Sequence, residues 1–171
     1  DGYERFALRH PELREQTVVV DSFSKPWAMT GWRIGWLAAA PSLAVQIAKA
    51  HQYMVSSAVS FEMPAAAAAL SVDPAPMLET YRARRARVLA ALEQMGLSVV
   101  EPVGAFYVFP SIKGTGLTSE QFCTRAIEEA GVGLVPGSCF GSEGYVRLSY
   151  CVSDEDLDEG LRRLDRFVAG L

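Results

Sequence analysis

The sequence predicts an α/β fold, and three observations support this. Short apolar runs rich in β-branched or aromatic residues recur along the chain, which is typical of buried strands. Longer stretches with helical periodicity lie between them, and the longest is 77–95. After that helix, strands and helices alternate over short distances to the end of the chain. We expect this last part to form a small α+β unit.

The expected elements follow from these patterns and from residues that favour helix ends. Apolar runs predict buried strands over 17–20 and 32–39, and further strands over 97–101, 105–109, 132–135 and 145–150. Helical periodicity predicts helices over 43–55, 65–70, 77–95, 118–130 and 153–168. Capping residues stand at several boundaries: Ser42, Thr118 and Ser153 at N-termini, and Gly96 at a C-terminus. The alanine run at 65–69 is interpreted as close helix packing.

A joint between two units is expected near Asp73. The sequence Asp-Pro-Ala-Pro at 73–76 interrupts the helical periodicity on either side of it. We therefore expect one unit over 1–75 and a second over 76–171.

Composition limits the class of protein. Half of the 171 residues are hydrophobic and 21% are charged, which is typical of a globular chain and not of a disordered one. The net charge of −4 disfavours a nucleic-acid-binding protein. No apolar stretch approaches the ~20 residues of a membrane span and no signal peptide is recognisable, so we expect a cytoplasmic location. The first residue is not Met, and we expect the chain to belong to a longer protein.

Two groups of residues, of kinds that also occur in other types of functional site, are interpreted as structural. The cysteines form no Cys-x-x-Cys pair and have no histidine cluster beside them, so we expect packed, reduced thiols and neither a disulfide framework nor a metal site. These cysteines are Cys123, Cys139 and Cys151. Four arginines crowd the 77–95 helix, namely Arg82, Arg84, Arg85 and Arg87. We expect them to form a solvated face that pairs with acidic residues elsewhere.

The segment 21–35 carries the densest set of functional groups. It begins where a strand ends, and ligands collect at strand ends in α/β sheets. The hydroxyls of Ser22 and Ser24 and the guanidinium of Arg33 are groups that bind phosphate. Lys25 lies between them and could attack an aldehyde if neighbouring aromatic rings desolvate its amine. This set suits a phosphate-bearing aldehyde cofactor, although a lysine in a polar loop is more often only solvated.

The spacing of these groups resembles a known cofactor-attachment site. Ser22-x-Ser24-Lys25, followed by Met29-Thr30-Gly31-Trp32-Arg33-x-Gly35, is similar to the pyridoxal-phosphate attachment motif of the class I and II aminotransferases. The resemblance implies that Lys25 is catalytic and forms the Schiff base with the cofactor. It also implies that Ser22 and Arg33 hold the cofactor phosphate, with help from Ser24.

One arginine stands inside the apolar run 145–150. The alternation of apolar and polar residues alone would place Arg147 on the solvent-facing side of a half-buried strand. Alternatively, its planar guanidinium is buried and binds a carboxylate. The stretch Pro-Gly-Ser-Cys-Phe-Gly at 136–141 precedes it, as in the aminotransferases, and Gly-Ala-Phe-Tyr at 104–107 matches their small domain. The resemblance therefore implies that Arg147 binds the α-carboxylate of the substrate.

The resemblance covers essentially the whole chain. It implies fold type I, with 1–75 as the end of the large cofactor-binding domain and 76–171 as the small α+β domain. It implies transfer of an amino group between an amino acid and a 2-oxo acid, with pyridoxal 5'-phosphate as cofactor and a homodimer as the full-length form. From the composition and the cysteine pattern given above, we expect no metal, nucleic acid or membrane partner. The residues that bind the pyridine ring are implied to precede this chain, so we expect the chain alone to be inactive or nearly so.

Two other functions share these motifs. A fold-type I lyase would use the same lysine and arginines but would release ammonia or a thiol instead of forming a new amino acid. An aminotransferase-like domain of a transcription regulator would bind the cofactor in order to sense it. The sequence does not specify the side chain of the substrate.

Overall fold

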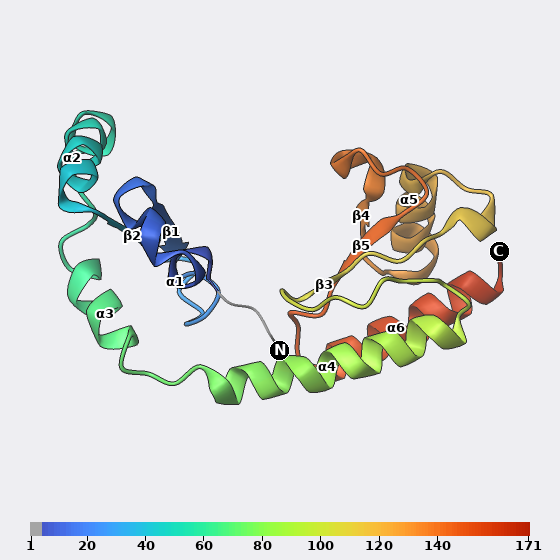
Figure 1. Ribbon diagram of the computed structural model, residues 1–171. Helices are drawn as coiled ribbons and strands as arrows, with labels where there is room; N and C mark the ends of the chain where they lie inside the picture. Colours follow the sequence, from blue (N-terminus) through green and yellow to red (C-terminus); the bar gives the residue numbers. More distant parts are fainter. Residues whose placement is uncertain (1–4) are drawn as a thin grey trace. The chain divides into compact units, whose positions relative to one another are not determined.

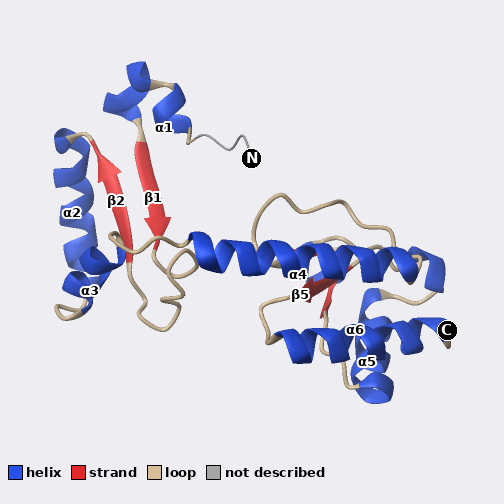
Figure 2. Ribbon diagram, turned by 90° about the horizontal axis from the view of Figure 1, so that it is seen from below, coloured by secondary structure: helices blue, strands red, loops and turns tan. Residues whose placement is uncertain are grey.

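The structure is a computed structural model that describes residues 5–171. The chain divides into two compact units, of which the first ends at Ala75 and the second runs from Pro76 to Leu171. Both units contain helices and strands (Figure 2), which confirms the α/β class predicted from the sequence. Within the described residues, no helix has the length and apolar character needed to cross a membrane.

The elements of the two units follow one another along the chain (Figure 1). The first unit contains α1 (Phe6–Arg9), η1 (Pro11–Gln16), β1 (Val18–Ser22), β2 (Gly35–Ala39), α2 (Pro41–Val55) and α3 (Glu62–Ala69). The second contains α4 (Ala75–Gln94), which begins at the boundary, and then β3 (Tyr107–Val108), η2 (Lys113–Thr115), α5 (Ser119–Ala130), β4 (Val135–Pro136), η3 (Gly137–Phe140), β5 (Val146–Ser149) and α6 (Asp154–Ala169).

The sheet of the first unit consists of β1 and β2, which run antiparallel (Figure 2). The register places Val18 opposite Ala39 at one end and Ser22 opposite Gly35 at the other. A Cβ atom on Gly35 would lie 2.7 Å from the carbonyl oxygen of Asp21, so this close pairing requires glycine. Residues 23–34 join the two strands at the end that Ser22 and Gly35 occupy.

The predicted burial of these two strands is wrong. Both strands form, but Val18 and Leu37 are exposed, and the Val20 side chain is 73% exposed. The second strand also begins later than predicted, at Gly35, because Arg33 has a left-handed backbone conformation with a φ of +52°. A residue in that conformation cannot continue an extended strand.

The helices of the first unit form close to their predicted positions. Helix α2 begins at Pro41, before the predicted cap Ser42, and the N-cap position falls on Ala40 without a side-chain hydrogen bond. Proline is favoured at the first helical position because its missing N–H would have no helical partner there. The predicted cap at Ser42 is therefore wrong.

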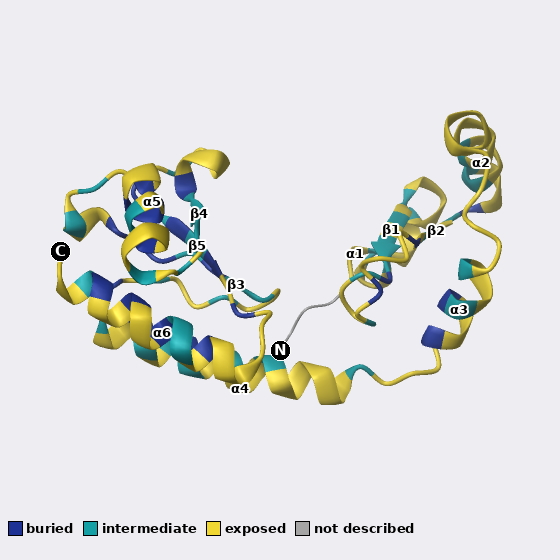
Figure 3. Cartoon of the chain, turned by 180° about the vertical axis from the view of Figure 1, so that it is seen from behind, coloured by how far each residue is buried: buried dark blue, intermediate teal, exposed yellow. Residues whose placement is uncertain are grey.

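The second unit is a three-stranded antiparallel sheet covered by three helices. The strand order is β3-β5-β4, so β5 is the central strand. Its Val146 and Leu148 side chains are buried, and Figure 3 shows buried positions along β5, α5 and α6. One continuous core joins the sheet and the helices through Val88, Leu92, Val108, Phe122, Ala126, Val146, Leu148, Leu157, Leu161 and Leu164.

The capping predictions for this unit are confirmed. The Thr118 hydroxyl accepts the backbone N–H of Gln121, and the Gln121 side chain accepts the N–H of Thr118, which completes a capping box for α5. The Ser153 hydroxyl accepts the N–H of Asp156 at the start of α6. Gly96 ends α4 in a left-handed conformation with a φ of +72°.

Three predicted strands of this unit differ from the structure. The stretch 97–101 forms no strand: Val100 is 89% exposed, so one side of the stretch has no core to pack against. The strands expected over 105–109 and 132–135 shrink to the short β3 and β4. Apolar residues favour a strand only where a neighbouring strand accepts their backbone hydrogen bonds, and periodicity cannot locate that neighbour.

The arginine cluster of α4 pairs with acidic residues, as predicted. Arg84 Nε lies 2.7 Å from Asp154 Oδ1, and the Arg87 guanidinium lies 2.7 Å from Asp154 and 3.0 Å from Asp158. These ion pairs connect α4 to the start of α6. The two guanidiniums hold the pKa of Asp154 below its usual range. The other two pairs are Arg82 with Glu79 and Arg85 with Glu101.

The cysteines are free thiols, but only one of them is packed as expected. Cys123 is buried, and burial raises the pKa of its thiol to about 11. Cys139 and Cys151 are exposed, and Cys151 Sγ lies 3.0 Å from the Tyr81 hydroxyl.

Replacing Gly160 with alanine is expected to stabilise the second unit. Gly160 lies in the middle of α6, and a Cβ atom there would meet no atom within 4 Å. Alanine loses less backbone entropy in a helix, so the free energy of unfolding should rise by about 0.5–1 kcal/mol. Urea unfolding followed by circular dichroism measures this change, and a lower midpoint for Gly160→Ala would contradict the expectation.

Candidate active site

The residues 23–34 between β1 and β2, called the lysine loop here, contain most of the predicted site. Ser22 is the last residue of β1, and Ser24, Lys25 and Arg33 belong to the loop itself. The N–H of Phe23 donates to the carbonyl oxygen of Ile34 at 3.3 Å, just beyond the last pair of the strand ladder. The first and last residues of the loop therefore lie beside one another.

The apolar residues of the lysine loop fix it to α3. Phe23, Met29 and Ile34 are buried in one cluster with Ala66 and Ala69. This contact confirms the interpretation of the alanine run as close packing only in part, because Ala67 and Ala68 are exposed. The Trp27 indole N–H also donates to the carbonyl oxygen of Val72 at 3.1 Å, which holds the loop near the end of α3.

The polar residues of the loop are more accessible. Ser22 and Ser24 are half-buried, whereas Lys25 and Arg33 are exposed. The Ser22 hydroxyl oxygen accepts the N–H of Ser24 at 3.0 Å, so its own hydrogen remains available for donation. Arg33 Nη1 donates to the carbonyl oxygen of Thr30 at 2.7 Å, which engages one of the five guanidinium N–H groups.

Two residues of the loop have a strained backbone. Ala28 has a φ of +53° and Arg33 a φ of +52°, and neither is glycine. The left-handed conformation costs about 1–2 kcal/mol for such residues. Strain of this kind is concentrated at functional sites, where the surrounding packing enforces it. In this loop, the buried cluster around Phe23, Met29 and Ile34 supplies that packing.

The aromatic rings near Lys25 do not bury it. Phe23 and Trp27 pack on each other, with ring centroids 5.2 Å apart, and Trp32 is 40% exposed. Lys25 itself is exposed. The predicted desolvation of Lys25 by its neighbouring rings is therefore wrong for this unit, because the packed rings face the cluster with α3.

Arg147 lies on the central strand of the second unit. Its neighbours Val146 and Leu148 point into the core, so Arg147 points to the opposite face of the sheet, where it is half-buried. Its Cζ atom lies 4.5 Å from the ring centroid of Tyr107 and 4.9 Å from that of Phe140. Within residues 5–171, no carboxylate forms an ion pair with it.

A hydrogen-bonded network holds η3, which carries Phe140. The buried Ser119 donates its N–H to Glu143 at 2.6 Å and its hydroxyl to the same carboxylate at 2.9 Å. Its oxygen accepts the N–H of Ser138 at 3.2 Å, and Gly144 donates to Glu143 at 2.9 Å. The start of α5, the 3-10 turn and the segment before β5 are thereby connected.

Acid is expected to weaken this network. The N–H groups of Ser119 and Gly144 and the Ser119 hydroxyl hold the pKa of Glu143 below its usual value. The ionised carboxylate therefore stabilises the fold above the unfolded-state pKa, and this contribution is lost as pH falls through the lower, folded-state pKa. Urea midpoints measured from neutral pH downwards should fall less for Glu143→Gln than for the wild-type protein or for the exposed control Glu93→Gln. Equal acid sensitivity in all three would contradict this.

The chain matches the family described as "Aminotransferase class I and II" over residues 3–164. It belongs to that family. Curated relatives include a probable N-acetyl-LL-diaminopimelate aminotransferase of Bacillus subtilis, which is 50% identical over 91% of this chain and 41% of its own length. An aspartate aminotransferase of Pyrococcus horikoshii is 39% identical over 99% of this chain and 47% of its own length.

Solved aminotransferase structures share this fold. The crystal structure of an aromatic aminotransferase from Pyrococcus horikoshii superposes with a TM-score of 0.89 at 39% identity, over 99% of this chain and 48% of that one. This similarity confirms the fold-type I prediction. The chain spans less than half the length of these relatives.

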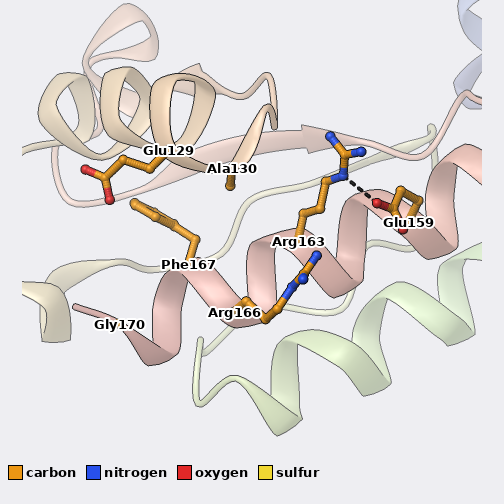
Figure 4. Close-up of a pocket in the computed structure, with 7 residues that line it drawn as sticks. All are labelled: Glu129, Ala130, Glu159, Arg163, Arg166, Phe167 and Gly170. Atoms are coloured by element: carbon orange, nitrogen blue, oxygen red, sulfur yellow. Dashed lines mark hydrogen bonds and ion pairs between the residues drawn. The ribbon is translucent and has the colours of Figure 1, made fainter.

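The second unit also contains a hollow of about 490 Å³. It opens between α5 and α6 and is lined by Glu129, Ala130, Glu159, Arg163, Arg166, Phe167 and Gly170 (Figure 4). Arg163 and Glu159 form an ion pair of 2.5 Å within it. The hollow contains none of the residues that the aminotransferase motifs select, so it is not the candidate site.

The sequence alone did not identify four residues that shape the surroundings of Arg147. They are Tyr107, Ser119, Phe140 and Glu143. Tyr107 and Phe140 do lie in the two stretches that match the family, which was the one signal pointing to them. Ser119 and Glu143 are 24 residues apart, and no local pattern predicts their contact.

Proposed function

We propose that this chain supplies the covalent, phosphate-binding and carboxylate-binding residues of a pyridoxal-phosphate-dependent aminotransferase. The enzyme transfers an amino group between an amino acid and a 2-oxo acid. Membership of the family implies the cofactor. The observation that carries the proposal is that one strained loop, fixed to α3, holds Ser22 at its edge and Ser24, Lys25 and Arg33 within it.

The groups of the lysine loop fit the chemistry of pyridoxal 5'-phosphate. Two hydroxyls and a guanidinium can donate hydrogen bonds to a phosphate, and a primary amine can condense with an aldehyde. The Ser22 hydroxyl and most of the Arg33 N–H groups are not engaged by the loop's own bonds described above. We assign the phosphate to Ser22 and Arg33 with help from Ser24, and the covalent bond to Lys25.

Lys25 and Arg147 act on the substrate. When bound, the cofactor withdraws electrons from the α-carbon and makes its proton acidic. The Nζ atom of Lys25 would be released when the amino group of the substrate takes its place, and could then accept the α-proton as a general base. The Arg147 guanidinium binds the α-carboxylate with two parallel hydrogen bonds, and so orients the C–H bond that breaks.

The rest of the proposal concerns the whole enzyme. Residues 1–75 belong to its large cofactor-binding domain and 76–171 to its small domain. Its substrates are an amino acid and a 2-oxo acid, and it acts as a homodimer in the cytoplasm. The residues that contact the pyridine ring lie outside this chain, so the chain by itself has little or no activity.

Covalent mapping tests the role of the lysine loop. The protein is incubated with pyridoxal 5'-phosphate and reduced with borohydride, and the modified peptides are identified by mass spectrometry. The chain has three lysines, Lys25, Lys49 and Lys113, so the other two serve as internal controls. At limiting cofactor we expect the adduct on Lys25, and equal labelling of all three lysines would contradict the proposal.

Product analysis of the holoenzyme tests the reaction. Aminotransfer yields a 2-oxo acid together with a new amino acid, in equal amounts. Release of ammonia or a thiol without a new amino acid would instead assign the enzyme to the lyases.

A further inference from the structure

Among the residues that the structure describes, the guanidinium of Arg147 contacts aromatic rings and forms no ion pair with a carboxylate. Its Cζ atom lies 4.5 Å from the Tyr107 ring centroid and 4.9 Å from the Phe140 ring centroid. We propose that Tyr107 and Phe140 are positioning residues, which hold the Arg147 guanidinium in the orientation that receives a carboxylate ligand. This inference rests on the proposed function, because that function assigns the carboxylate to Arg147.

The charge environment of Arg147 supports this role. Seven other arginines of the second unit lie within ion-pair distance of a carboxylate: Arg82, Arg84, Arg85, Arg87, Arg125, Arg162 and Arg163. Among the described residues, Arg147 and Arg166 have no such partner, and of these two only Arg147 lies against aromatic rings. An aromatic face attracts a guanidinium without neutralising its charge or accepting its in-plane N–H groups. Two rings can therefore fix Arg147 while its donors stay available for a ligand.

The strand register explains how Tyr107 reaches Arg147. Tyr107 on β3 lies opposite Ser149 on β5, and Arg147 is two residues from Ser149 on the same strand. Tyr107 and Arg147 are thus diagonal neighbours on one face of the sheet, a spacing that long side chains bridge. The adjacent Phe106 ring, with its centroid 4.6 Å from that of Tyr107, supports the tyrosine.

Phe140 reaches Arg147 from the end of η3. Its side chain is 49% exposed, so core packing does not account for its position. Its ring forms a T-shaped pair with Phe109, with ring centroids 5.9 Å apart. Phe109 in turn stacks on Tyr145, with ring centroids 5.4 Å apart. The turn itself is fixed by the Ser138 bond to Ser119 described above. The position of Phe140 is therefore fixed by the Phe109 ring and by the backbone of η3.

Paired substitutions separate the effect of the ring from that of side-chain bulk. Phe140→Leu and Tyr107→Leu keep an apolar side chain but remove the aromatic face, whereas Phe140→Tyr and Tyr107→Phe keep it. The Phe140 pair is the main test, because Phe140 is half exposed and its replacement removes no core residue. Thermal unfolding of each variant confirms that it is folded.

Two measurements are made on the holoenzyme. NMR relaxation and hydrogen exchange of the Arg147 Nε–H report the order of the guanidinium without depending on turnover. Steady-state kinetics use the amino acid and 2-oxo acid identified by product analysis. We expect each leucine variant to increase the mobility and the exchange rate of the Arg147 Nε–H group. Each should also raise KM for both substrates by about 2- to 30-fold, with a smaller change in kcat. The ring-preserving variants should stay close to the wild-type protein in both measurements.

The outcomes distinguish this inference from the proposed function. Arg147→Ala with an unchanged KM would refute the carboxylate role of Arg147 and, with it, this inference. Arg147→Ala with a raised KM, together with leucine variants that leave both the Nε–H order and KM unchanged, would overturn the positioning role alone. A raised KM in the leucine variants with an unchanged mobility of the Arg147 Nε–H group would also overturn the positioning role, because the rings would then affect substrate binding without orienting the guanidinium.

Discussion

Replacing Lys25 with alanine in the holoenzyme is expected to lower kcat by at least about 1,000-fold. The substitution removes the amine that bonds to the cofactor and also the general base, which alone contributes roughly 100- to 10,000-fold. Because the Lys25 side chain is exposed, its loss should change the thermal unfolding midpoint of the cofactor-free protein by little. Turnover and the borohydride-stable adduct are measured on the same preparation, and both should disappear.

Two matched variants show whether the effect belongs to the amine. Lys25→Arg keeps a positive charge but cannot form the covalent bond and does not lose its proton near neutral pH, so we expect it to be as inactive as Lys25→Ala. Lys49→Ala removes another exposed lysine, from α2, and should keep full activity. Activity within tenfold of the wild-type enzyme in either Lys25 variant would refute the assigned role.

Replacing Gly137 with alanine is expected to destabilise the second unit by about 3 kcal/mol. An alanine Cβ atom would overlap the carbonyl oxygen of Ser142 and lie 2.5 Å from that of Tyr145. Both obstacles are backbone atoms, so no side-chain rotation relieves the clash, and overpacking of this kind costs about 1–3 kcal/mol or more. The hydrogen bonds from Gly137 to Tyr145 and from Ser142 to Gly137, at 2.8 and 2.9 Å, show how closely the segments approach.

Urea unfolding measures this loss, and hydrogen exchange locates it. Peptides that cover η3, β4 and β5 should exchange faster in Gly137→Ala, because those elements depend on the turn. Gly114→Ala is the matched control, since a Cβ atom there meets nothing within 4 Å. A Gly137→Ala midpoint equal to that of Gly114→Ala would show that the backbone accommodates the methyl group.

Loss of the turn should also affect Arg147. Gly137 begins η3 and Phe140 ends it, so a displaced turn moves the Phe140 ring away from the guanidinium. Any Gly137→Ala protein that remains folded should therefore show a raised KM as well as lower stability.

Features that depend on a few neighbouring residues were determined by the sequence alone. The capping box at Thr118, the cap at Ser153 and the left-handed Gly96 all follow from side chains within about three residues of a helix end. The lysine loop is equally local: the spacing of Ser22, Lys25 and Arg33 identifies the family because all three lie on one connected segment.

Features that depend on which segments meet were decided only by the tertiary structure. The sequence predicted acidic partners for the α4 arginines, but the packing of α4 beside α6 selected Asp154 and Asp158. The family resemblance predicted that Arg147 binds a carboxylate. The aromatic rings around Arg147, however, come from β3 and η3, and these segments reach it only through strand pairing and the Ser119 network. Burial of Val20 and a strand at 97–101 were predicted wrongly for the same reason. A local sequence pattern indicates how apolar a segment is. Whether that segment is buried depends on another segment that is distant in the sequence.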